Sequence, residues 1–197
     1  PAQGRSRACC GVGGVLTQAA ARGRPLPRAV FDDRLTYKDA CGDVHPLHAP
    51  GHSEDAPVVF LPGRRLLPGG DVVEWPLPDS ARGKGAGEWI RALQFLRRLP
   101  VDLVVPAHGP AMDRRIVDAD ERSIAGVYRA VAAAKSSGVS RDALDLPVER
   151  FLAEDVTVDD VDAAVDRENL LRAGDEVSRT AGSGPQDRGR LTTVKGD

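Results

Sequence analysis

Residues 50–71 read PGHSEDAPVVFLPGRRLLPGGD, and residues 101–110 read VDLVVPAHGP. Each segment contains a short run of apolar, largely β-branched residues that is bounded by glycine and proline. Runs of this length and composition are typical of buried strands, and the glycines and prolines mark sharp turns at their ends. The two segments therefore predict a sheet whose strands end in tight loops.

Three side chains that can bind a metal stand in these loops: His52, Asp71 and His108. Each lies next to a glycine and close to the end of a predicted strand. Imidazole nitrogen and carboxylate oxygen are ligands that zinc accepts. Loops held by a rigid sheet are a common place for a catalytic metal site, so these three residues are candidate ligands.

The surrounding sequence predicts an α/β fold. The strand that ends near His108 follows a helical pattern, so we expect it to run parallel to an earlier strand, with His108 just beyond its carboxyl end. In the last predicted helix, the expected apolar stripe consists of Val161, Ala164, Val165 and Leu171. Apolar periodicity and turn signals predict strands at 30–37, 44–47, 58–61, 66–67 and 103–105, and helices at 87–99, 113–136 and 157–178.

Composition bounds the class of protein. Hydrophobic residues make up 41% of the 197 residues, which suffices for one packed core. We expect one domain over 29–178, between a flexible lead-in at 1–28 and a disordered tail at 179–197. A net charge of −2 and the lack of a bilayer-length apolar run argue against nucleic-acid and membrane partners. Three cysteines do not form a disulfide framework, which favours a cytoplasmic protein.

The three motifs, in their order along the chain, resemble those of the metallo-β-lactamase superfamily of metallo-hydrolases. PGHS at 50–53 is similar to the motif whose histidine binds a first zinc. GGD at 69–71 is similar to the motif whose aspartate bridges two metals, and PAHGP at 106–110 to the motif whose histidine binds the second zinc. The resemblance covers roughly residues 30–139.

This resemblance implies a fold and a chemistry. The fold would be a partial αββα sandwich with C-terminal helices. The centre would hold one or two zinc ions, with His52 in the first site, His108 in the second, and Asp71 shared between them as the catalytic carboxylate. In the family a metal-bound hydroxide attacks the substrate, so the expected activity is hydrolysis of an ester, lactone, thioester or amide-like bond in a small molecule.

One part of the family pattern is absent from this sequence. The signature H-x-H-x-D-H lies upstream of the first motif, whereas the first histidine here is His45. Without it each metal keeps fewer than the three protein ligands usual for catalytic zinc. The simplest interpretation is that an N-terminal metal-binding half is missing, which would impair metal binding and activity. The alternatives are a non-catalytic truncated remnant, a partner subunit, and completion of the site by another chain.

Four further residues have two interpretations each. His45 and His48 could replace missing ligands, although a strand would point only one of them at the site, or they are histidines on a strand surface. Asp55 could hydrogen-bond a ligand imidazole or cap its own loop. Trp75 follows the Asp71 motif in a loop rich in proline and glycine, and could be a wall of the substrate pocket or a packed surface aromatic.

Overall fold

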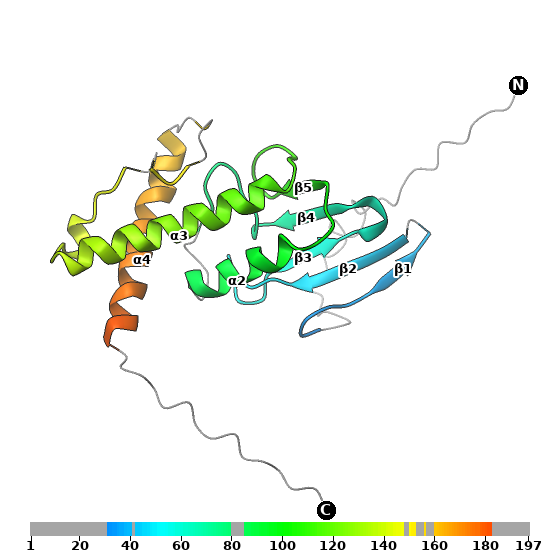
Figure 1. The fold of residues 1–197 in the computed structure, drawn as a ribbon, viewed down its shortest axis with the longest axis horizontal. Coiled ribbons are helices and arrows are strands. Elements are labelled where there is room, and N and C mark those ends of the chain that lie inside the picture. The colour runs from blue at the N-terminus through cyan, green and yellow to red at the C-terminus, as the bar shows by residue number, and fades with distance from the viewer. Residues whose placement is uncertain are drawn as a thin grey trace, which may run out of the picture.

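The computed structural model describes residues 31–40, 42–79, 85–147, 150–152, 156 and 160–182 (Figure 1). The lead-in expected at 1–28 lies outside these residues, as does the expected tail from residue 183 onward. The strands are β1 Tyr37–Asp39, β2 Gly42–His48, β3 Pro57–Phe60, β4 Leu66–Gly70 and β5 Leu103–Pro106. The helices are α2 Ala86–Leu96, α3 Arg115–Ser136 and α4 Asp160–Gly182, with 3-10 turns η2 Pro62–Arg64 and η4 Arg141–Ala143.

Two small sheets carry the fold. β1, β2 and β3 form an antiparallel sheet in that order, and β4 pairs with β5 in parallel. The two sheets are joined where β3 turns into β4, since Leu61 and Leu66 exchange backbone hydrogen bonds of 2.9 and 3.3 Å. Helix α2 is the crossover between the parallel strands, as parallel pairing requires. The parallel pairing predicted for the strand at 103–105 is therefore confirmed.

The start of the first hairpin differs from the prediction. The strand expected at 30–37 is interrupted, although Leu35 still donates its N–H to Pro46 and His48 donates to Asp33. Gly42 pairs with Asp39, so the second strand begins before the start expected at residue 44.

Helices α2 and the first half of α3 cover the sheets on one side and form the main core (Figure 1). The one-faced pattern predicted for α2 is confirmed, because Trp89, Leu93 and Leu96 are all buried. From the sheets, the core receives Leu47, Val58, Phe60, Leu67 and Val104. None of the described helices has the length and hydrophobicity that crossing a membrane requires.

Strand β5 is buried on one face alone. Val104 is fully buried, but Leu103 is 43% and Val105 39% exposed. Successive side chains of a strand point to opposite faces, and in the described part of the chain the helices cover one of these faces. The prediction of a fully buried strand at 103–105 is therefore wrong for the outer face.

The second half of α3 packs with α4 around a smaller core. Leu170 and Ala173 are the buried hydrophobic residues of α4 among those described, whereas Leu171 is only half-buried. The stripe predicted through Leu171 is thus displaced by one residue, and the side chains of its other members lie outside the described residues. Helix α4 continues to Gly182, beyond the helix end expected at 178. This smaller core comprises Val127, Val131, Leu144, Phe151, Leu170 and Ala173.

Candidate metal site

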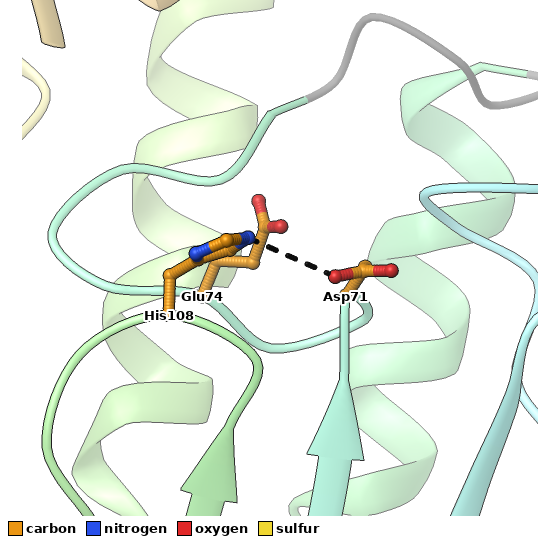
Figure 2. Close-up of side chains that lie close together, drawn as sticks. All are labelled: Asp71, Glu74 and His108. Atoms are coloured by element: carbon orange, nitrogen blue, oxygen red, sulfur yellow. Dashed lines mark ion pairs between the residues drawn. The ribbon is translucent and has the colours of Figure 1, made fainter. Parts of the chain in front are cut away.

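Asp71 and His108 meet at the edge where the two parallel strands end. Asp71 directly follows β4, and His108 lies two residues after β5, so the register that pairs Gly70 with Pro106 brings them together. Figure 2 shows both strand arrows pointing toward the site. His108 Nε2 lies 4.0 Å from Asp71 Oδ1. Both side chains are exposed, Asp71 by 54% and His108 by 73%, so the site is open to solvent on this side.

Backbone hydrogen bonds fix the two loops to one another. The N–H of Ala107, next to His108, donates to the carbonyl oxygens of Gly70 at 3.2 Å and Val73 at 3.3 Å. Val73 and its neighbour Val72 are fully buried and anchor the turn after Asp71 in the core. The separation of Asp71 and His108 is thus set by main-chain contacts rather than by the two side chains alone.

A third carboxylate, Glu74, completes the group. Each of Asp71, Glu74 and His108 offers a ligand atom, and these atoms lie within 4.8 Å of one another. Glu74 comes from the same turn as Asp71 but is only 4% exposed, and it closes the site on the buried side (Figure 2). Burial raises the pKa of Glu74 to about 7, against the lowering effects of a hydrogen bond from the Asp79 N–H and of nearby His52.

Sequence reasoning passed over Glu74, although it lies between two residues that we singled out, Asp71 and Trp75. The signal was available in the apolar neighbours on both sides, Val72 and Val73 before it and Trp75 after it. A glutamate inside such a run is seldom buried without a partner. Asp71 and Glu74 lie three residues apart in one turn, and both carboxylates lie on the side of the turn that faces the site (Figure 2).

His52 lies beside this group but its ring nitrogens are not among the atoms within 4.8 Å. Its Nδ1 is 3.1 Å from the carbonyl oxygen of Asp79. A carbonyl oxygen only accepts, so Nδ1 carries the proton, and Nε2 of the neutral ring has a free lone pair. The His52 ring meets the Trp89 ring edge to face, at 6.3 Å between centroids.

Each site histidine adjoins a glycine that makes room for a tryptophan. A Cβ on Gly51 would lie 2.5 Å from Trp89 Cδ1, and a Cβ on Gly109 would lie 2.7 Å from Trp75 Cβ. Gly109 also has a φ of +91°, which side chains rarely adopt. Trp89 in turn donates its indole N–H to the carbonyl oxygen of Val72 at 2.9 Å. The PGH and HGP motifs therefore pack their glycines on these rings.

The remaining residues with two interpretations lie as follows. His45 Nδ1 is 3.0 Å from Thr36 Oγ1, and its ring stacks on Phe60. His48 Nε2 is 2.9 Å from the carbonyl oxygen of Glu54. Neither belongs to the metal-binding group found among the described residues.

Asp55 makes a hydrogen bond within its own loop, and Trp75 packs against other parts of the protein. Asp55 Oδ1 accepts a hydrogen bond from the Ser53 hydroxyl at 2.9 Å, which is the loop-capping arrangement. Trp75 is half-buried and packs on the main core as well as on Gly109. Both contacts fit the packing interpretation of these residues, and Trp75 holds the loop that carries His108.

A family model described as the metallo-beta-lactamase superfamily matches residues 12–108, which include both His52 and His108. Over these residues the chain is similar to the metallo-β-lactamase superfamily. The predicted α/β class is confirmed with it, because the described sheets and helices have the arrangement of this fold.

Several known proteins resemble the chain over part of their length. A linear primary-alkylsulfatase from Pseudomonas sp. (strain ATCC 19151) is 33% identical over 95 residues, which are 45% of this chain and 18% of the sulfatase. A metallo-β-lactamase family protein from Thermus thermophilus is 15% identical, with a TM-score of 0.56 over 86% of this chain and 56% of its own. The sec-alkylsulfatase Pisa1 from Pseudomonas sp. is 12% identical, with a TM-score of 0.54 over 80% of this chain and 28% of its own. The chain therefore spans less than two thirds of each of these relatives.

The donor set of this metallo-β-lactamase-type site suits a divalent metal. Two ligands at ~2.1 Å from one ion lie no more than ~4.2 Å apart. The observed separations of up to 4.8 Å therefore need only small side-chain rotations. One imidazole and two carboxylates match the preferences of zinc and of related divalent ions.

Proposed function

We propose that this chain is a metal-dependent hydrolase that binds a divalent ion, zinc in the first instance, through Asp71, Glu74 and His108. The observation that carries the proposal is the convergence of their three ligand atoms within 4.8 Å at the ends of two parallel strands. Three protein ligands with an open side are typical of catalytic zinc. His52, which the motif resemblance names as a ligand, would add its Nε2 from the neighbouring loop.

A zinc ion bound at this site supplies water activation and polarises an oxygen of the scissile bond. The residues of the chain would hold the ion and orient the substrate next to it. Asp71 and His108 lie on the open side, where substrate enters, while Glu74 lies behind them with its Oε2 held by the Asp79 N–H at 2.5 Å. In the metal-free chain the Glu74 carboxyl has a pKa of about 7, so binding of a divalent ion near neutral pH should displace its proton.

The proposed substrate is a small molecule with an ester, lactone, thioester or amide-like bond. Two of the relatives are named as alkylsulfatases, so sulfate esters belong in the same test set. Asp71 and His108 are each more than half exposed, so the described side of the site is open. The fold alone does not select one substrate, so a panel of compounds should be tested.

Metal titration tests the proposal directly. Chelator-treated protein should take up zinc in a stoichiometric ratio, and hydrolysis of at least one panel substrate should stop on chelation and return with zinc. His108→Ala should lose both properties, while the matched change His48→Ala, which removes an exposed histidine outside the group, should keep them. Protein that is folded and binds no zinc, or a His108→Ala variant that binds it as wild type does, would rule the hydrolase proposal out.

The second candidate is a non-catalytic partner subunit whose site is completed by another chain. The exposure of Asp71 and His108, together with the apolar outer face of β5 at Leu103 and Val105, supports this alternative. Uptake of zinc only after mixing with a chain that carries the H-x-H-x-D-H segment would favour it over the autonomous hydrolase.

A further inference from the structure

One peptide group, between Pro78 and Asp79, lies behind the site and makes a hydrogen bond at each end. Its N–H, from Asp79, donates to Glu74 Oε2 at 2.5 Å. Its oxygen, from Pro78, accepts from Asn169 Nδ2 at 2.9 Å. Because the peptide group is planar and its C=O and N–H point in opposite directions, fixing the direction of the oxygen also fixes the direction of the N–H.

Asn169 comes from helix α4, ninety-one positions further along the chain. The residue is 2% exposed, and its bond to Pro78 is buried. A buried amide is costly unless its hydrogen bonds are made, so a polar residue at this position needs a specific partner. The Pro78 carbonyl oxygen supplies one.

Asp79 also makes a hydrogen bond with His52. The Asp79 carbonyl oxygen accepts from His52 Nδ1 at 3.1 Å. Asp79 thus contacts Glu74 through its N–H and His52 through its C=O, and its backbone sets the orientation of both side chains. Any rotation of the peptide group before Asp79 would change the Glu74 contact and disturb the position of the His52 contact.

A second contact from α4 keeps the helix in place relative to the site. Glu176, seven residues after Asn169 and therefore on the same face of the helix, accepts from the N–H of Ala86 at 3.3 Å. It also accepts from the Tyr128 hydroxyl at 2.5 Å. Helix α4 therefore holds Pro78 through one side chain and the start of α2 through another.

We propose that Asn169 is a positioning residue for the metal site: through the Pro78–Asp79 peptide group it orients the Glu74 carboxyl, and through Asp79 the His52 imidazole. The part of this inference that concerns metal affinity rests on the proposed function. The part that concerns the peptide group does not, because the hydrogen bonds are made by the protein alone.

The test compares two variants of α4 in the full chain. Asn169→Leu keeps the size and burial of the side chain but removes the donor to Pro78. Leu170→Ala is the matched control, because it removes a buried contact with the smaller core from the adjacent residue and leaves the Asn169 donor in place. Both variants are expected to lower Tm, so Tm cannot separate them, and two other readouts do.

The first readout is hydrogen exchange of the Asp79 amide in metal-free protein. It should accelerate by at least ~10-fold in Asn169→Leu and change little in Leu170→Ala. The second is zinc affinity from competition with a chromophoric chelator, which should weaken by ~10–100-fold in Asn169→Leu alone. Asn169→Gln, which retains an amide donor, should recover part of both losses; if Asn169→Leu does not fold, Asn169→Ala takes its place.

The outcomes separate the two proposals. Unchanged Asp79 exchange in a folded Asn169→Leu protein would overturn the positioning role, whatever the protein binds. Equal zinc affinity in wild type and Asn169→Leu would also overturn it. If wild type takes up no zinc while Asp79 exchange responds as expected, the proposed function fails and the role of Asn169 in setting the loop stands.

Discussion

The carboxylate of Asp120, in helix α3, accepts a hydrogen bond from the backbone N–H of Glu74 at 3.1 Å. Asp120 is 1% and Glu74 4% exposed, so two buried carboxyl groups lie next to each other behind the metal site. Burial raises the pKa of Asp120 well above its ordinary value, as it raises that of Glu74 to about 7. The protein thus keeps two acids that favour their neutral forms when no cation is bound.

This pair makes stability depend on pH. The unfolded chain releases the Glu74 proton near pH 4.5, whereas the folded chain holds it to about pH 7. Between these values the folded state binds more protons, so the free energy of unfolding should fall as pH rises, by up to ~1.4 kcal/mol per pH unit for one group. Urea unfolding of chelator-treated protein at pH 5, 6 and 7 measures the slope. Stability that rises across this window would contradict the assigned burial of the two acids.

Replacing Glu74 by glutamine should separate stability from metal binding. Glu74→Gln removes a group that is costly to ionise but retains an oxygen that can accept from the Asp79 N–H. We expect the variant to be more stable than wild type at pH 7, by roughly 1–3 kcal/mol, and to have a flatter pH profile. Its zinc affinity should fall by at least ~10-fold, because a neutral amide is a poor ligand. Glu168→Gln, at an exposed position of α4, is the control for loss of one negative charge.

The packing of Gly51 on Trp89 predicts a sharp response to one methyl group. In Gly51→Ala the new Cβ would lie 2.5 Å from the indole ring, so the loop with His52 or the ring itself must shift. Overpacking of this kind costs ~1–3 kcal/mol, which a melting curve would detect. Gly63→Ala is the control, since a Cβ there meets nothing within 4 Å. Equal melting temperatures for both variants would show that the loop yields freely.

The register of helix α4 predicts unequal effects at two adjacent leucines. Leu170→Asp places a charge in the smaller core and should cost roughly 2–5 kcal/mol of unfolding free energy. Leu171→Asp changes a half-buried residue and should cost clearly less. Chemical denaturation of both variants measures the difference. A larger loss in Leu171→Asp would support the stripe expected from the sequence instead.

Zinc removal gives the last prediction. If the ion binds only the folded chain, saturating zinc at ~100 times its Kd should raise stability by ~2.7 kcal/mol. The increase should vanish in His108→Ala and persist in His45→Ala, whose imidazole contacts Thr36. Differential melting with and without zinc checks this, and an identical shift in both variants would place the ion elsewhere.

Sequence reasoning succeeded where a short pattern fixes a position. Asp71 and His108 follow apolar runs directly, so knowing that the strands are parallel was enough to bring them to one edge. The helix with Trp89 was equally clear, because its apolar face repeats with the helical period.

It failed where the outcome depends on tertiary packing. Glu74 enters the site because buried Val72 and Val73 close the turn beneath it. Its apolar neighbours indicate that Glu74 is buried, but they do not indicate that its side chain turns toward Asp71 and His108. The outer face of β5 has the same composition as its inner face, so no pattern reveals that Leu103 is exposed. Helix α4 offers adjacent leucines, and only contact with α3 selects Leu170 over Leu171.

The chain contains two tryptophans, and each packs on the glycine beside a site histidine. Trp89 adjoins Gly51 and His52, while Trp75 adjoins Gly109 and thus the loop of His108. All indole fluorescence of this protein therefore comes from rings that pack against the two loops that would close around an ion. Emission intensity and wavelength should consequently report ordering of the centre without any added label, and Trp75→Phe or Trp89→Phe would assign the signal to one loop or the other.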